Sequence, residues 1–226
     1  GSGAGAGGMI DSVTSVTGSS AIAISTGAGG TNNGSDARYG GYRVGAGTSY
    51  VGVVGTNSTF GSALTALGGG AGSNWDVSTT RSGGSGGGGT ASGGTQTAAG
   101  VATDPTQGNS GGYDINSCGS LYSYPTGGGG GAGGSGQNGY CPTYVAGRPG
   151  DGGIGKKSDI TGTAIYYAGG GGGAGHNDGT YPAFQGAGGL GGGGNGTTWQ
   201  AGIKGPGACA NTSVYGGQGE DGKGGG

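Results

Sequence analysis

The sequence predicts an irregular, glycine-rich fold, with polyglycine or polyproline II-type helices packed in layers, projecting loops, minor β-strand content and almost no α-helix. Three observations support this prediction. Glycine accounts for 74 of the 226 residues, aperiodic inserts separate the glycine runs, and no stretch has the spacing of an amphipathic helix. The glycine runs occupy residues 68–72, 83–94, 127–136, 169–175, 186–196 and 216–226.

The composition argues against two other glycine-rich classes. Collagen requires glycine at every third position and abundant proline, whereas this chain has consecutive glycines and six prolines. Disordered linkers are the second class, and the low content of Leu, Ile, Val and Phe is compatible with them. Disordered chains are usually rich in charge and poor in aromatic residues. Here charged residues make up 8% of the chain and tyrosine occurs 12 times, which favours a folded protein.

Backbone-to-backbone bonding is the interaction expected to order the chain. Fixing a residue costs roughly 1–2 kcal/mol, and glycine loses the most freedom, so the 24 Leu, Ile, Val and Phe residues cannot supply a sufficient apolar core. An extended helix with three residues per turn directs its polar groups outward. Without side chains, such helices can approach and bond one another. At ~3.1 Å per residue, the run 127–136 is expected to span about 31 Å.

The inserts between the runs are candidates for recognition loops. Tyr and Trp offer rigid contact area, and Ser, Gly and Asn adaptable hydrogen bonds, as in antibody paratopes. An alternative reading is that these aromatic residues only cap the ends of the glycine layers. For the set together we expect receptor binding, with the best anchors being Trp75, Tyr122, Tyr124, Tyr181, Phe184 and Trp199.

Conventional secondary structure is expected at only a few places. Residues 13–24 and 50–54 are β-like, and residues 161–167 alternate like a strand that leads into a glycine run. We therefore divide the chain into a lead-in segment, residues 1–26, and a glycine-rich sandwich domain with loop inserts, residues 27–226. Both ends of the sequence suggest a fragment of a longer chain.

Several stretches resemble the glycine-rich domain of phage and prophage tail-fibre proteins. The first group is GGYRV at 40–44, TSYVGV at 48–53 and NSTFGS at 57–62, followed by GGG at 68–70. The later group is YYA at 166–168, GGL at 188–190 and ANT at 210–212, each near further glycines. The resemblance covers residues 27–226, although residues 213–215 depart from it.

The general form is also similar to the receptor-binding adhesins on the long tail fibres of T-even-like phages. That resemblance implies a layered sandwich of polyglycine II helices whose loops bind a host-surface receptor, either an outer-membrane protein or a glycan. It further implies a location on the virion, outside the cell, and contacts with other fibre proteins. The resemblance leaves open whether the chain forms a homo-oligomer. The chain lacks a recognisable fibre-attachment domain.

The sequence offers no evident catalytic or cofactor chemistry. His176 is the single histidine, so no two-histidine metal site can form, and the acids are dispersed rather than paired for acid–base work. We therefore expect no enzyme activity, no cofactor and no metal. Lysine and arginine form no cluster that would bind nucleic acid, and no apolar stretch is long enough to span a bilayer.

The cysteines allow one disulfide. Cys118 and Cys141 flank the 127–136 run, and a bridge between them would contribute ~3 kcal/mol on the chain-entropy model. Reduced thiols are the alternative, because virions can assemble in reducing cytoplasm. Cys209 would remain unpaired.

Three function classes follow from these features. The first is non-catalytic receptor recognition by a phage tail fibre. The second is an ice-binding protein of the glycine-rich helix-bundle type, although such proteins keep a Gly-X-X repeat and a flat face. The third is a subunit of a self-assembling extracellular filament.

Overall fold

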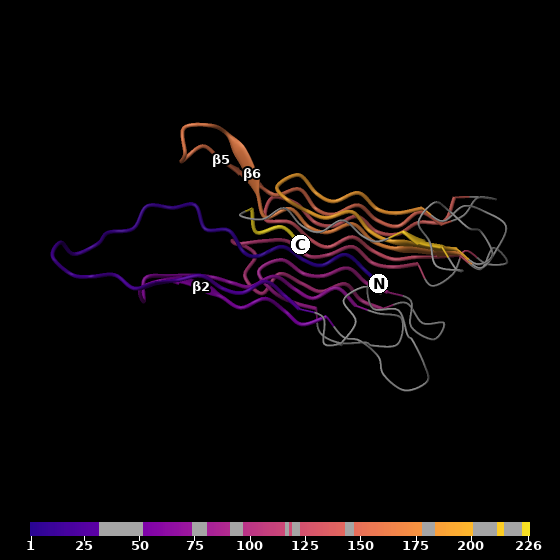
Figure 1. Ribbon diagram of the computed structural model, residues 1–226, viewed down its shortest axis with the longest axis horizontal. Helices are drawn as coiled ribbons and strands as arrows, with labels where there is room; N and C mark the ends of the chain where they lie inside the picture. The colour runs from indigo at the N-terminus through magenta and orange to yellow at the C-terminus, as the bar shows by residue number, and fades with distance from the viewer. Residues whose placement is uncertain are drawn as a thin grey trace.

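A computed structural model describes residues 1–31, 52–73, 81–90, 97–115, 118, 123–142, 147–177, 184–200, 212–214 and 223–226. Within this part of the chain there is no helix, and the strands are short. Figure 1 shows a long body in which glycine-rich segments run side by side along the long axis. The expected irregular fold with minor strand content is therefore confirmed at this level.

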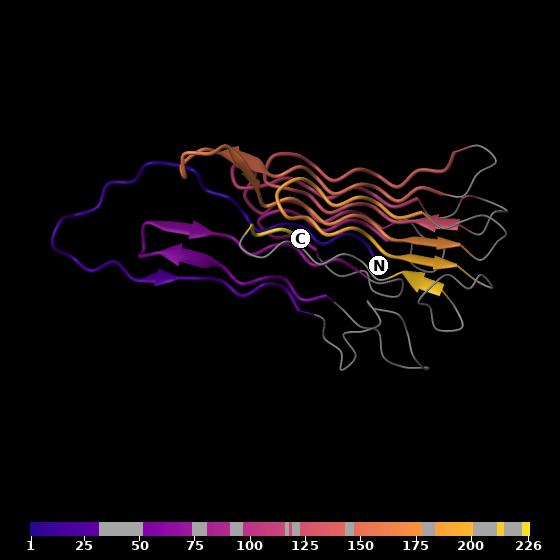
Figure 2. The ribbon, with the colours of Figure 1, turned by 45° about the horizontal axis from the view of Figure 1, so that its top comes forward.

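Short strands gather at the two ends of the body (Figure 2). One end, called here the hairpin end, carries the antiparallel sheet β1 (Ile24–Ser25), β2 (Ser58–Phe60) and β3 (Leu64–Ala66), and the pair β5 (Lys156–Ser158) and β6 (Ile165–Tyr167). The opposite end, called the four-strand end, carries β4 (Ser123–Pro125), β7 (Gly175–Asn177), β8 (Thr198–Gln200) and β9 (Thr212–Val214). In this sheet only the β7–β8 pair is parallel.

The glycine-rich segments are held together by backbone hydrogen bonds with a period of three residues. Segment 126–132 is the clearest case, because its amides donate in three alternating directions. Gly127 and Gly130 donate to Gly89 and Gly86, Gly128 and Gly131 to Gln137 and Gly134, and Gly129 and Ala132 to Gly171 and Ala168. Residues three apart thus face the same neighbouring segment.

The carbonyl groups of segment 126–132 accept from further neighbours. Gly3 and Ala6 donate to Gly127 and Gly130, Gly150 and Gly153 to Thr126 and Gly129, and Gly112 to Gly128. Together with the segments that receive its amides, six described segments surround this one. The backbone groups of residues 126–130 are thereby satisfied by other backbone groups, and the Gly131 carbonyl accepts the Asn109 side-chain amide at 2.9 Å.

Glycine is required here because the segments lie too close for a Cβ atom. A Cβ built on Gly129 would overlap the Ala4 oxygen, and one built on Gly128 would overlap the Asp151 oxygen. Among the described residues, the buried apolar side chains are small: the alanines Ala6, Ala71, Ala168 and Ala174, and the prolines Pro125 and Pro149. The core of this protein is therefore made of backbone.

The run 127–136 does not form one straight span, so the expectation of about 31 Å is wrong. It turns back on itself, with the Gly131 amide donating to the Gly134 carbonyl at 2.9 Å. Its two arms then bond each other, because Gly128 donates to Gln137 at 3.0 Å. The run 186–196 turns in the same way at residues 190–192. There Gly191 and Gly192 have φ of 103° and 96°, a region that glycine enters without steric cost.

The strand predictions were too long. Of residues 13–24 only Ile24 lies in a strand. The Ala23 carbonyl still accepts the amide of Gly61, directly after β2, whereas Val13 is fully exposed. Of residues 161–167 only the last three are in β6, since the amide of Gly162 closes a turn onto the carbonyl of Asp159. Of residues 50–54, the first two lie outside the described residues and the rest belong to no named strand.

Residues 1–9 lie within the packed glycine segments although the sequence places them in the lead-in segment. Ser2, Gly5 and Gly8 donate to Ser73, Gly70 and Leu67, again with a period of three. The division at residues 26 and 27 therefore does not follow the edge of the glycine packing.

Substitution of Gly129 by alanine should destabilise the protein strongly, by about 3 kcal/mol or more, because facing backbone must move. Gly171→Ala should cost less, since its Cβ would lie 3.1 Å from the Gly226 oxygen and 3.2 Å from the Ala4 nitrogen. Gly29→Ala is the matched control, with nothing within 4 Å, and should change stability by less than about 0.5 kcal/mol. Urea unfolding measures all three, and equal midpoints for Gly129→Ala and Gly29→Ala would contradict the backbone core.

Candidate functional site

Several inserts that carry or adjoin aromatic residues emerge at the four-strand end, whereas the hairpin end has tight turns and the connections that form β1–β3 and the β5–β6 hairpin. Neighbouring glycine segments run back and forth along the body (Figures 1 and 2). At the hairpin end, two of the returns are the tight turns at residues 131–134 and 190–192. At the four-strand end, four connections are flanked by the described residues 115 and 123, 142 and 147, 177 and 184, and 200 and 212.

Buried hydroxyl groups tie neighbouring segments together close to Ser2. Ser73 Oγ lies 3.1 Å from Ser2 Oγ and 2.8 Å from Thr90 Oγ1. The amide of Thr90 donates to Thr97 Oγ1 at 2.8 Å, and the amide of Thr97 donates to Asp114 Oδ1 at 2.9 Å. These bonds fix the points at which the chain leaves the glycine core.

A buried charge pair lies in the same cluster. Asp114 is 0% exposed and Arg81 is 3% exposed. Burial raises the pKa of Asp114, against the opposing effects of its backbone hydrogen bonds and of the Arg81 charge. Burial likewise lowers the pKa of Arg81, and Asp114 opposes that shift. Arg81 Nη1 also donates to the carbonyl of Ala98 at 3.0 Å. This geometry is that of a structural anchor, because both side chains point into the protein.

A disulfide joins two of the connections. Cys118 and Cys141 are bonded, with their Cα atoms 5.4 Å apart. The turn within residues 127–136 brings the two cysteines to the same end. The amide of Cys118 also donates to the carbonyl of Ser123 at 3.0 Å, so the bridge is continuous with the start of β4.

Three of the six sequence-predicted anchors fall within the described part of the chain, all at this end. Tyr124 is half-buried in β4, opposite His176 of β7. Trp199 lies in β8, in register with His176 on its other side. Phe184 is half-buried, with the guanidinium carbon of Arg148 4.4 Å from its ring centroid. Trp75, Tyr122 and Tyr181 lie outside the described residues.

Tyr113, Tyr140 and Arg148 are not among the predicted anchors. All three are exposed. Tyr113 directly follows a Gly-Gly pair, and Tyr140 directly follows Gly139. The sequence signal for Tyr113 and Tyr140 is an aromatic residue directly after a glycine segment, because the glycine packing fixes the backbone at that position.

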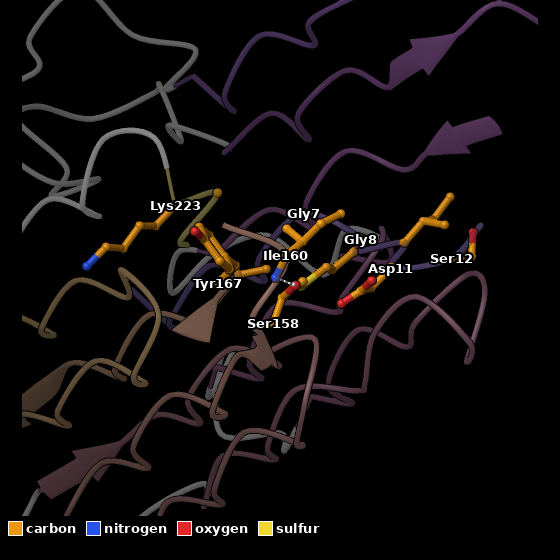
Figure 3. A pocket seen from close by; sticks show the side chains of 12 residues that line it. Gly7, Gly8, Asp11, Ser12, Ser158, Ile160, Tyr167 and Lys223 are labelled. Carbon is orange, nitrogen blue, oxygen red and sulfur yellow. Dashed lines mark hydrogen bonds between the residues drawn. The ribbon is translucent and has the colours of Figure 1, made fainter. Parts of the chain in front are cut away.

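A shallow hollow of about 350 Å³ lies at the hairpin end, between residues 7–12, the β5–β6 hairpin and Lys223 (Figure 3). Its lining includes Asp11 and Ser158, and the Ser158 hydroxyl accepts the amide of Ile160 at 3.4 Å. No histidine or cysteine is among the lining residues.

Two other kinds of site were sought in the part of the chain that the structure describes. No group of three or more His, Cys, Asp or Glu side chains comes together there as a metal would require. No described helix has the length and apolar character needed to cross a bilayer.

Comparison of the chain with protein-family models, with curated proteins and with solved structures finds no match.

Removal of the disulfide should lower the free energy of unfolding by about 3 kcal/mol, because it releases a loop closed over a sequence separation of 23 residues. The Cys118→Ser/Cys141→Ser double variant and the reduced native protein should both unfold at lower denaturant concentration. The double variant also serves as the control, since a reductant should not shift its midpoint further. If the reductant leaves the unfolding midpoint of the native protein unchanged, the bridge does not stabilise the protein.

Proposed function

We propose that this chain is a non-catalytic adhesion protein of a phage tail fibre, whose connecting loops recognise a receptor on the host surface. The observation that carries the proposal is the sorting of the connections between the two ends. Four inserts that carry or adjoin aromatic residues leave the glycine core at the four-strand end, whereas the hairpin end has tight turns and the connections that form β1–β3 and the β5–β6 hairpin. Loops on a rigid scaffold are where binding usually resides.

The scaffold in this proposal is a layered bundle of polyglycine II helices. The period of three in the hydrogen bonds of residues 1–9 and 126–132 supports it, because a helix of this type has three residues per turn. The close approach of facing backbones supports it too, since only glycine leaves room for such contacts.

A scaffold of this kind favours recognition through several weak contacts. The flanks of the inserts are held by buried hydrogen bonds and by the Cys118–Cys141 bridge, so fewer degrees of freedom are lost on binding. If several copies stand on one virion, avidity multiplies a modest affinity by ~10²–10⁴. The partners in this proposal are a host outer-membrane protein or surface glycan, and other fibre proteins.

A filament subunit is the second candidate, and one observation favours it. Large apolar side chains are exposed along the hairpin end: Val13 at 102%, Ile24 at 71% and Ile160 at 80%. Apolar surface of this kind often marks protein–protein contact. Ordered polymers of the purified protein in electron micrographs would support this function, and monodisperse particles at high concentration would oppose it.

Exchange of an insert should abolish cell binding without unfolding the protein. We expect that replacing residues 178–183 by a Gly/Ser stretch of equal length removes binding of the labelled protein to a bacterial strain selected from a broad panel. The matched control replaces residues 159–164, which are exposed at the hairpin end, and should keep binding. Flow cytometry measures binding, and thermal unfolding checks the fold. Equal binding by both variants would argue that the inserts are only caps.

Binding should proceed without turnover of the receptor. No histidine or cysteine lines the hollow at the hairpin end, and the buried Asp114 acts as an anchor. We expect purified protein to bind surface polysaccharide from a responsive strain and to release no oligosaccharide during prolonged incubation, measured by reducing-end analysis. Steady release of reducing ends would instead indicate an enzyme and direct attention to Asp76, Asp114 and Asp178.

A further inference from the structure

A strip of exposed aromatic and cationic side chains crosses the outer segments near the four-strand end. Its members, called here the Tyr–Arg strip, are Tyr113, Tyr140, Arg148 and Phe184. Tyr113 is 53% exposed and Tyr140 is 51% exposed. Arg148 is exposed and Phe184 is half-buried. The four residues come from four different glycine-flanked segments that the fold brings side by side.

Tyr140 and Arg148 form a directly opposed pair. Each donates its amide to the carbonyl of the other, at 2.9 Å and 2.8 Å, in an antiparallel bridge. Residues opposed in this way project their side chains to the same face. On its other side, Arg148 lies over the Phe184 ring at 4.4 Å. Arg148 therefore has Tyr140 as its cross-strand neighbour and the Phe184 ring under its guanidinium.

Tyr113 lies on the segment that pairs with residues 138–139, next to Tyr140. The amide of Gly139 donates to the Tyr113 carbonyl at 2.9 Å. The Asn138 side chain accepts the Tyr113 amide at 2.7 Å. These two bonds fix the position of Tyr113 next to the segment that carries Tyr140.

The backbone beneath the strip is tightly held. Gly147 and Pro149, on either side of Arg148, are both buried. A Cβ on Gly147 would lie 2.6 Å from Cys118 Sγ and 2.7 Å from the Pro125 ring. Cys141, next to Tyr140, is bonded to Cys118. The strip is therefore preorganised, which lowers the entropic cost of binding.

We propose that the Tyr–Arg strip binds a polysaccharide that carries carboxylate groups. Exposed tyrosine rings offer flat faces to the apolar faces of sugar rings. A guanidinium supported on an aromatic ring keeps its N–H edges for bidentate bonds to a carboxylate. The nearest acid along the chain, Asp151, bonds another segment, since its Oδ1 accepts the amide of Ala187 at 2.7 Å.

This inference rests on the proposed adhesive function and names the ligand class of one part of the surface. It also explains how a chain with net charge −2 could retain an anionic ligand. The attraction is local to Arg148, whereas the molecule as a whole repels anions weakly. Binding should accordingly depend on one cation rather than on total charge.

The test measures binding of the full chain to three immobilised carboxylated polysaccharides, alginate, polygalacturonate and colominic acid, with dextran as the neutral probe. We expect at least one carboxylated probe to bind, more weakly at higher salt, and dextran not to bind. Arg148→Ala should weaken that binding by about tenfold or more. Tyr140→Ala should weaken it as well, and Arg148→Lys should restore it only in part, because lysine lacks the planar fork.

Lys157→Ala is the matched control, because it removes one positive charge from an exposed position of β5 at the hairpin end. It should bind like the native protein, and unchanged thermal unfolding should show that each variant is folded. Three outcomes would overturn the proposal that the Tyr–Arg strip binds a carboxylated polysaccharide. They are equal losses of binding in Arg148→Ala and Lys157→Ala, equal binding to dextran and to the carboxylated probes, and binding to no carboxylated probe.

Cell binding separates this inference from the proposed function. If the native protein and Arg148→Ala bind a responsive strain equally while no carboxylated probe is retained, the adhesive function stands and the strip is wrong. If the native protein binds no cell in the panel, the adhesive function fails independently of the probes.

Discussion

The need to satisfy buried backbone polar groups governs this structure. A conventional core hides apolar side chains and pairs its backbone in helices or sheets. Here the buried material is itself backbone, and each segment must bond its neighbours in several directions. Segment 126–132 does so by placing residues three apart against the same neighbour. A side chain at most of these positions would separate two segments and leave their amides and carbonyls unpaired.

The same constraint explains where side chains are allowed. At the rim of the packing, polar side chains stand in for a missing backbone acceptor. Asn57 accepts the amide of Gly68 at 2.9 Å, and Asn195 accepts the amide of Gly188 at 2.9 Å. In the described part of the chain, the larger aromatic residues lie in the short strands or where a segment leaves the core, as at Tyr113 and Tyr140. The glycine packing thus confines the chemistry of the chain to its surface and its two ends.

The coarse fold could be predicted from the sequence because glycine runs and low aliphatic content leave few alternatives. The turn within residues 127–136 could not, because a run of identical residues carries no local signal for where it reverses. Gly129 and Gly131 look alike in sequence, yet one lies amid packed backbone and the other begins a turn. Residues 13–24 show the converse: their β-branched residues suggest a strand, but a strand forms only where a partner lies beside it.

The candidate site was predictable in kind and less so in detail. Aromatic inserts indicated a binding surface, and Phe184 lies in one at the four-strand end. Arg148 and Tyr140 were harder to choose, because their importance depends on a pairing across segments that sequence spacing does not reveal. The reciprocal bonds between these two residues close the connection from residue 140 to residue 148.

A core made of backbone separates stability from recognition. In a conventional domain, side chains that pack the core and side chains that bind a ligand compete for the same positions and tolerate few changes. Here stability resides in hydrogen bonds between glycine segments, which are the same whatever the inserts contain. An insert can therefore change in length and sequence at little cost, provided that its flanking anchors, such as Asp114 and the Cys118–Cys141 bridge, remain. A protein that must follow a varying surface receptor would gain from this division.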